Sequence, residues 1–381
     1  MKILFMSHWY PNRYDKMFGL FVQKHAEAVS IYCDVAVLYV HADENIKDFE
    51  LIKQKINKVT EYVIYYPINK KRFFYPFTKL INYAKAYKIG FRKLKKDGFN
   101  FDLIHSNILT RTPTVAYLYS LFNRTPYIIT EHWSRYLPER NQFNGFFRKM
   151  VARIVVKNAK AVFPVSENLK KHMLEHKLYN NNYLIVNNVV DDFFLERSTP
   201  EIRNKKRIIH ISCFDEKAKN TKGLLRAVKQ VGSERDDFNF QMIGSGIDLN
   251  ETIQYCKEIN VSDIVEFLGE LSPKEVAKRL MNADFFCLFS NYENVPVVIS
   301  ESLTCGKPVI ATNVGGISEH VNETNGILIN PQDEKTLADA LNYMLDHFHE
   351  YDAEKISKKA YEMYSFENVG KYLVNIYKSV L

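Results

Sequence analysis

Short apolar runs alternate with longer amphipathic stretches along the 381-residue chain. The apolar runs are continuous rather than alternating, which is typical of strands covered by helices on both faces of a sheet. Helical stretches separate most of them, including Phe18–Ser30, Lys222–Val231, Pro273–Met281 and Leu337–His347. This alternation predicts parallel, doubly wound sheets. We expect strands at Lys2–Ser7, Asp34–Val40, Tyr62–Tyr66, Asp102–Ser106, Tyr127–Thr130, Ala161–Val165 and Tyr183–Val186, and then at Arg207–Ser212, Asn239–Ile243, Val265–Leu268, Asp284–Phe289, Pro308–Thr312 and Gly326–Ile329.

The strand–helix series runs twice, with a polar, proline-containing stretch at Asp191–Lys206 between the two runs. The length also fits two domains. We therefore expect an α/β protein with a Rossmann-like domain over residues 1–194 and another over 195–365. Two such units placed face to face make a cleft at the carboxyl ends of their strands, where α/β folds bind ligands.

Composition and charge narrow the class of protein. No run approaches the ~18 apolar residues of a membrane-spanning helix, and the apolar start is too short for a signal peptide, so we expect a cytoplasmic protein. The five cysteines lack the spacing of a zinc or redox motif. Residues 1–194 hold 30 Lys or Arg against 16 Asp or Glu, whereas 195–381 hold 22 against 28. Only the first half therefore suits an anionic partner.

The segment Lys70–Asp97 carries ten Lys or Arg and one acid, interleaved with Phe, Tyr, Leu and Ile. A basic amphipathic helix of this kind can lie on an anionic membrane surface, and Lys70–Lys96 would make that contact. The alternative is a solvated helix whose apolar side packs on its own domain. No nucleic-acid reader module is recognisable here, so nucleic acid is not an expected partner.

The segment Asp284–Val321 carries the most informative chemistry. A buried strand ends at Ser290, and Pro296 then suits the first turn of a helix that stops at Gly306. A helix amino end at the carboxyl edge of a sheet offers free N–H groups and a positive dipole to phosphate. The glycine pair at 315 and 316 permits a second close approach. Glu293 at the mouth could hold sugar hydroxyls, and Glu301 a ribose diol, although each alone reads more simply as a surface or dipole-facing glutamate.

These residues resemble the retaining nucleotide-sugar glycosyltransferases of the B-type fold, in the group 1 family (glycosyltransferase family 4). The signature is two glutamates separated by seven residues, matched here by Glu293-Asn294-Val295-Pro296 and by the run from Glu301 to Val309. The next motif, A-T-x-x-G-G-x-x-E, matches 311–319. The resemblance implies that Glu293 is catalytic and that Asn294, Val295 and Glu301 bind the donor.

The donor side extends the resemblance. The stretch 211–227 resembles the family's G-R-L…K-G…L-L-x-A segment, and its spacing puts Lys219, rather than Lys222, at the lysine that binds the donor diphosphate. The family arginine falls near Cys213, which supplies no charge; Lys217 is one replacement. Gly244 lies in a turn similar to the family's G-x-G near the nucleotide.

The first domain completes the resemblance. Trp9-Tyr10-Pro11 and Gly19 resemble the glycine-bearing loop that approaches donor phosphate and acceptor. His132 follows a strand, as does the histidine that family members place beside the transferred sugar, although a lone histidine reads more simply as structural. The C-terminal stretch 366–381 resembles the last helix of the family, which packs back on the first domain.

The implied activity is retaining transfer of a sugar from a nucleotide-diphosphate sugar to a glycan or lipid-linked glycan, in surface polysaccharide or lipopolysaccharide biosynthesis. The chain has no Asp-x-Asp motif, so we expect no metal and no other cofactor, with Lys219, helix ends and loop amides stabilising the leaving group. Three alternatives stay open at this point: a nucleotide-sugar epimerase of the same architecture, a non-catalytic sugar-nucleotide-binding protein, and an oxidoreductase. The oxidoreductase lacks its G-x-G-x-x-G after the first strand.

Overall fold

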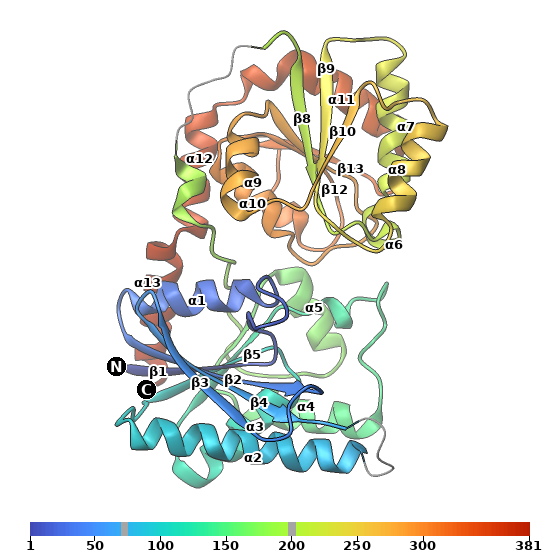
Figure 1. Ribbon diagram of the computed structural model, residues 1–381. Coiled ribbons are helices and arrows are strands. Elements are labelled where there is room, and N and C mark those ends of the chain that lie inside the picture. The colour runs from blue at the N-terminus through green and yellow to red at the C-terminus, as the bar shows by residue number, and fades with distance from the viewer. Residues whose placement is uncertain (70–74, 197–202) are drawn as a thin grey trace. The chain divides into compact units, whose positions relative to one another are not determined.

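The computed structural model describes residues 1–69, 75–196 and 203–381 (Figure 1). Its contacts divide the chain into two compact units. Unit 1 comprises Met1–Val165, Lys170–Val189 and Phe366–Leu381, and unit 2 comprises Ser166–Leu169 and Val190–Ser365. After Val189 the chain passes into unit 2, and Phe366 begins its return to unit 1. Residues 197–202 of the expected linker and residues 70–74 of the basic segment lie outside the described residues.

Unit 1 is built on a seven-stranded sheet of order β3-β4-β2-β1-β5-β6-β7. All neighbouring strands are parallel except β3, which pairs antiparallel with β4 at the sheet edge. The strands are β1 (Lys2–Ser7), β2 (Asp34–Asp43), β3 (Glu50–Ile56), β4 (Val59–Pro67), β5 (Leu103–Asn107), β6 (Tyr127–Glu131) and β7 (Val162–Pro164). The helices are α1 (Leu20–Ser30), α2 (Tyr75–Lys96), α3 (Arg111–Asn123), η1 (Ser134–Tyr136), α4 (Phe146–Asn158), α5 (Glu167–Glu175, shared with unit 2) and α13 (Phe366–Val380).

The helices of unit 1 form two layers. In Figure 1, α2, α3 and α4 lie on one side of the sheet, and α1 and α13 on the other. Helix α13 packs on α1 so closely that a Cβ on Gly370 would lie 2.2 Å from the carbonyl oxygen of Ala28. The last helix of the chain therefore belongs to the core of unit 1.

The strands of unit 1 differ from the expected ones at two places. Strand β3 was missed because an edge strand pairs through its backbone, and its sequence ELIKQKI shows no buried run. Conversely, Tyr183–Val186 is no strand: a single bridge joins Tyr183 to Val162. Pro164 in the facing strand has no N–H to donate, so the ladder stops there.

Unit 2 is built on a six-stranded parallel sheet of order β10-β9-β8-β11-β12-β13. The strands are β8 (Lys206–Ile211), β9 (Phe238–Ile243), β10 (Val265–Gly269), β11 (Phe285–Leu288), β12 (Val309–Thr312) and β13 (Gly326–Ile329). The helices are η2 (Asp192–Leu195), α6 (Glu216–Lys219), α7 (Thr221–Gly232), α8 (Leu249–Glu258), α9 (Pro273–Met281), α10 (Val297–Thr304), η3 (Ile317–Glu319), α11 (Glu334–His347), η4 (Phe348–Glu350) and α12 (Ala353–Tyr364).

Both faces of the unit 2 sheet are buried, which explains the continuous apolar strands. One core packs the sheet against α7, α8 and α11, and the other against α9, α10 and α12 (Figure 1). Local signals set the helix ends. Helix α9, for example, begins at Pro273 after a capping box formed by Ser272 and Glu275. Both units are Rossmann-like.

None of the helices in the described ranges is long and apolar enough to cross a membrane.

Candidate functional site

Lys219 and Glu293 form an ion pair where the strands of unit 2 end. Lys219 is the last residue of α6, which follows β8, and Glu293 lies in the loop after β11. The ammonium Nζ of Lys219 donates to Oε1 of Glu293, and each side chain is only 11% exposed. Ser290 at the end of β11 donates its hydroxyl to the same carboxylate oxygen, at 2.8 Å. Strands β8 and β11 are hydrogen-bonded neighbours, and this is why two distant segments meet here.

The charge of Lys219 is maintained by its partner. Burial alone would lower the pKa of this ammonium, but the Glu293 carboxylate and nearby Cys213 and Asp215 outweigh it and raise the pKa above its ordinary value. The sequence analysis named Lys222 as the competing candidate. Its ammonium pairs instead with Glu251, a side chain that is 64% exposed.

The loops that carry the pair are tied together by their backbones. Asn291 donates its backbone N–H to the carbonyl of Ala218 at 2.8 Å and its side-chain amide to the carbonyl of Lys217 at 3.0 Å. Thr312 at the end of β12 donates its hydroxyl to the carbonyl of Ser290 at 2.7 Å. Hydrogen bonds to main-chain carbonyls therefore join the loops that follow three strands. Ser290, Asn291 and Thr312 had no role in the sequence analysis.

The Gly315-Gly316 turn closes on the Glu293 loop. Gly315 has a left-handed φ of 58°, and a Cβ there would lie 2.0 Å from the carbonyl oxygen of Glu293. Gly316 donates its N–H to the carbonyl of Asn294 at 2.8 Å. Only glycine fits this approach, so the turn fixes the backbone on which Glu293 stands.

Helix α10 starts directly after this loop, with Pro296 as its N-cap residue. Its free N–H groups and positive dipole end face the same edge of the sheet. Asn294 and Val295 precede it and are half-buried, and Asn294 accepts a 3.3 Å hydrogen bond from the Ser166 hydroxyl. Glu301 lies more than one turn inside the helix and is half-buried.

The turn at Gly244 lies beside the end of β8. Gly244 donates its N–H to the carbonyl of Gly269 at 2.8 Å, and the Ser212 carbonyl lies against it. Cys213, where the family has arginine, is exposed, and the Lys217 side chain is exposed as well.

In unit 1, His132 follows β6 and is held by Glu131. One oxygen of the buried Glu131 carboxylate accepts the backbone N–H groups of His132 and Trp133, both at 2.9 Å. The other accepts the Tyr136 hydroxyl and the backbone N–H of Leu109, also at 2.9 Å. Glu131 thus fixes the loop that carries His132. The signal was an acid at the end of a buried strand, to which the sequence analysis gave no role.

His132 is neutral near neutral pH. Burial lowers its pKa well below the ordinary value, and the neighbouring His25 and His105 lower it further, against a hydrogen bond with the Asn188 side chain. Its ring lies 4.3 Å from that of Phe21, between centroids. A neutral imidazole offers one donor and one acceptor, which suits a polar ligand group.

Gly19 is the N-cap residue of α1 and lies in the left-handed region, with φ 70°. A Cβ there would lie 2.5 Å from the carbonyl oxygen of Trp9. The ring of Trp9 in turn lies 5.1 Å from that of Trp133, next to His132. The Gly19 loop and the His132 loop therefore pack together in unit 1.

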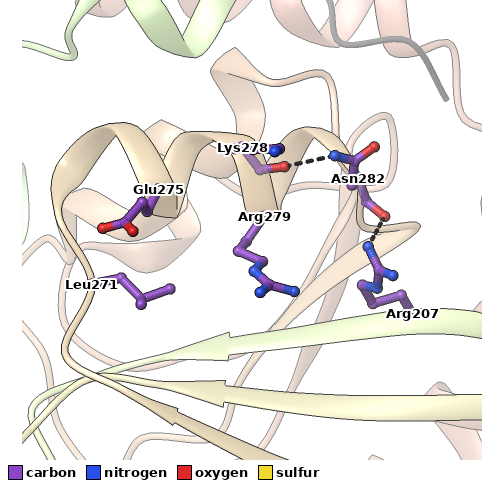
Figure 2. Close-up of a pocket in the computed structure, with 6 residues that line it drawn as sticks. All are labelled: Arg207, Leu271, Glu275, Lys278, Arg279 and Asn282. Atoms are coloured by element: carbon purple, nitrogen blue, oxygen red, sulfur yellow. Dashed lines mark hydrogen bonds between the residues drawn. The ribbon is translucent and has the colours of Figure 1, made fainter. Parts of the chain in front are cut away.

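A hollow of about 220 Å³ lies beneath α9 in unit 2 (Figure 2). None of the residues singled out from the sequence lines it. At one end of the hollow, the Arg207 guanidinium in β8 donates to the carbonyl of Asn282 at 3.4 Å. Its lining residues are Arg207, Leu271, Glu275, Lys278, Arg279 and Asn282. Within the ranges 1–69, 75–196 and 203–381, no three His, Cys, Asp or Glu side chains gather as metal ligands would.

Two family models match the chain in tandem. Residues 33–192 match Glycosyltransferase Family 4, and residues 192–363 match Glycosyl transferases group 1. The two matches meet in the segment where the chain passes from unit 1 to unit 2.

Individual relatives agree with these models. An uncharacterized glycosyltransferase of Methanocaldococcus jannaschii is 32% identical over 159 residues, which are 41% of this chain and 40% of that relative. The D-inositol 3-phosphate glycosyltransferase of Corynebacterium urealyticum is 26% identical over 316 residues, 75% of this chain and 73% of the relative. The structure of Anabaena Alr3699/HepE in complex with UDP superposes with a TM-score of 0.74 at 17% identity, covering 100% of both chains.

Proposed function

We propose, on the premise that this chain belongs to the group 1 family of glycosyltransferases, that it moves a sugar from a nucleoside-diphosphate sugar to a glycan or lipid-linked glycan. We further propose that the sugar keeps its anomeric configuration and that no metal takes part. The pathway we propose is surface polysaccharide or lipopolysaccharide biosynthesis, with the enzyme in the cytoplasm.

The observation that supports this best is the Lys219–Glu293 ion pair at the carboxyl edge of the unit 2 sheet. A buried lysine that stays charged is a ready partner for a diphosphate. In the proposed reaction Lys219 turns from Glu293 to the donor diphosphate, and Glu293 becomes available to the sugar hydroxyls. The amino end of α10 and the Gly315-Gly316 amides then meet the remaining phosphate oxygens.

The transfer step needs positive potential at the leaving group. The bond between the anomeric carbon and the diphosphate oxygen breaks, and its electron pair stays on the diphosphate. The acceptor hydroxyl oxygen bonds to the anomeric carbon on the same face, and its proton passes to the departing phosphate oxygen. Once Lys219 has turned to the diphosphate, its ammonium and the helix end lower the barrier because they face the oxygens on which negative charge grows.

Glu293 is not proposed as a covalent nucleophile. Its Oε1 is held by Lys219 and Ser290, an arrangement that suits a hydrogen-bonding and electrostatic role. His132, neutral and anchored by Glu131, is proposed to orient the sugar. Trapping a glycosyl adduct on Glu293 by mass spectrometry would overturn this mechanism.

The donor is proposed to contain a nucleoside diphosphate, as does the ligand in the HepE structure. Differential scanning fluorimetry against a panel of nucleoside diphosphates should raise the melting temperature with at least one base. The best donor series is then tested for transfer to glycan acceptors. If no diphosphate stabilises the protein and no nucleotide sugar is consumed, the proposal fails.

An acceptor held at a membrane fits the basic segment Lys70–Lys96, of which 70–74 lie outside the described residues. Seven Lys or Arg residues and no acid lie in α2. We propose an anionic membrane surface as a partner, with the protein peripheral on the inner face.

An epimerase of the same architecture is not favoured, because both matching family models describe glycosyltransferases. An assay without acceptor separates the two. The epimerase would convert the donor sugar alone, whereas the transferase leaves its configuration unchanged.

A further inference from the structure

Helix α4 presents apolar side chains on two opposite faces. Ala152, Val155 and Val156 are buried in unit 1. On the other side, Phe146 and Phe147 are 77% and 75% exposed, although a phenylalanine side chain gains much by burial. We call this exposed set the α4 face; its members are Phe146, Phe147, Met150, Val151 and Ile154. At 100° per residue they form one continuous stripe along the helix.

Helices α2 and α3 also expose apolar side chains. Helices α2, α3 and α4 lie on the same side of the unit 1 sheet (Figure 1), and α3 contacts α4. Phe122 at the end of α3 is 84% exposed, and Phe77 near the start of α2 is 65% exposed. A continuous apolar stripe such as the α4 face marks an interaction surface, whereas single exposed apolar side chains do not. The other exposed apolar residues of α2 and α3 are Leu80, Ile81, Leu118 and Leu121.

The charge around this surface selects the partner. Helix α4 carries four Lys or Arg residues and α2 carries seven, and no Asp or Glu lies in α2, α3 or α4. Arg148 and Lys149 directly follow the phenylalanine pair. A second copy of the same face would bring these cations against each other. An anionic lipid surface attracts them and also takes up the apolar stripe.

We propose that the α4 face inserts into an anionic bilayer, with Phe146 and Phe147 entering the boundary between headgroups and acyl chains. Helix α2 then serves as the basic flank and not as the inserted helix. Its apolar side is largely used inside unit 1, where Tyr83, Ala86, Tyr87, Gly90 and Leu94 are buried. This goes beyond the basic segment in the proposed function, because it assigns insertion to another helix.

Vesicle flotation tests the surface directly. With phosphatidylglycerol–phosphatidylcholine vesicles at low salt, the wild-type protein should float. The double variant Phe146→Ser/Phe147→Ser should have a partition coefficient onto the vesicles that is lower by about tenfold or more. Both side chains are exposed, so the variant should keep the wild-type circular dichroism spectrum. The matched control is Ile247→Ser, which removes an 87% exposed apolar side chain in unit 2 and should float like wild type.

A tryptophan at the face reports insertion itself. The variant Phe147→Trp should show blue-shifted emission with these vesicles and quenching by brominated acyl chains, whereas Ile247→Trp should show neither. High salt should weaken binding, since the basic residues supply the attraction. Flotation of Phe146→Ser/Phe147→Ser equal to wild type, no flotation of wild type, or a stable dimer broken by this double variant would each overturn the proposal. None of these measurements needs turnover, so failure here is distinguishable from failure of the transferase assay.

Discussion

Lys219 and Glu293 lie together where little solvent reaches, so each side chain determines what the other can do. Burial of an ammonium without a partner favours its neutral form. With Glu293 beside it, the pKa of Lys219 is raised and the ammonium is kept. The pair therefore keeps Lys219 charged, and in the proposed reaction the diphosphate replaces the Glu293 carboxylate as partner of this ammonium.

Replacing Glu293 by Gln should lower the rate of transfer by about a hundredfold or more, because the carboxylate that we propose holds the sugar hydroxyls is lost. It should also lower the free energy of unfolding by about 3 kcal/mol, since one charge of a buried pair remains. Steady-state kinetics and urea unfolding measure the two effects.

The control for that variant is Glu251→Gln. It breaks the Lys222–Glu251 pair, whose carboxylate is 64% exposed, and such a pair contributes little to stability. Equal losses in the two variants, or transfer by Glu293→Gln within about threefold of wild type, would count against a role for the buried pair.

The buried histidines predict a loss of stability in acid. Burial lowers the pKa of His25 to about 4, and an unfolded histidine titrates near ~6.5. The unfolded chain therefore binds more protons between these values, and the stability of unit 1 falls as the pH falls below about 6.5. His25 alone should lower the free energy of unfolding by about 2 kcal/mol when the pH falls from about 7 to about 5.

Tryptophan fluorescence during urea unfolding measures this, because both tryptophans of the chain, Trp9 and Trp133, lie in unit 1. His25→Gln keeps a donor for the carbonyl of Asn187 and should flatten the pH dependence in part, since His105 and His132 still contribute. An unaltered slope in His25→Gln contradicts the assignment.

Residue spacing identified Lys219 and Glu293 as candidates but could not reveal the residues that hold the site loops in place. Glu131 and Asn291 act through hydrogen bonds with backbone groups that are distant in sequence, and Ser290 donates to the Glu293 carboxylate across a turn. No local pattern marks such partners. Whether His132, Gly19 and Gly244 act on the substrate stays a prediction.

At the scale of elements, the Gly315-Gly316 turn positions the Glu293 loop. Gly315→Ala should reduce both stability and kcat/KM, because the new methyl group would collide with the carbonyl of Glu293. We expect the free energy of unfolding to fall by about 2 kcal/mol or more.

Gly269→Ala is the matched control, since Gly269 also has a positive φ, 67°, but nothing lies within 4 Å of its added Cβ. It should show only the conformational cost, about 1 kcal/mol, with wild-type kcat/KM. If the two variants behave alike in transfer assays, the turn does not position the loop.

Elements with a buried face could be predicted, and those without one could not. Helix α9 has the bounds expected from the sequence, and α10 lies between Pro296 and Gly306 as expected. Strand β3 escaped because its contacts are main-chain hydrogen bonds at an exposed edge. The exposed apolar stripe of α4 also escaped, since a sequence pattern does not distinguish which of two apolar faces is buried.

For the whole molecule, the alternation of strands and helices was sufficient to predict two sheets, which are parallel apart from the edge strand β3. The charge difference between the halves also follows from the sequence: 30 Lys or Arg against 16 acids up to Phe194, and 22 against 28 beyond it. This difference fits the proposals that the first half meets an anionic surface and that a few cations of the second half bind the donor.

Metal independence of sugar transfer is a prediction at the scale of the whole molecule. Transfer in EDTA should stay within about twofold of transfer with added Mn²⁺ or Mg²⁺, because Lys219 and the α10 amino end supply the positive potential. Loss of activity in EDTA that Mn²⁺ restores would contradict it.

Isothermal titration with the best-binding nucleoside diphosphate tests the central claim most directly. The test variant is Lys219→Met. The control is Lys222→Met, which removes the ammonium that pairs with Glu251. We predict one site per chain, an affinity loss of about tenfold or more in Lys219→Met, and wild-type affinity in Lys222→Met. Equal affinities for wild type and Lys219→Met, with both folded, would show that the diphosphate binds elsewhere.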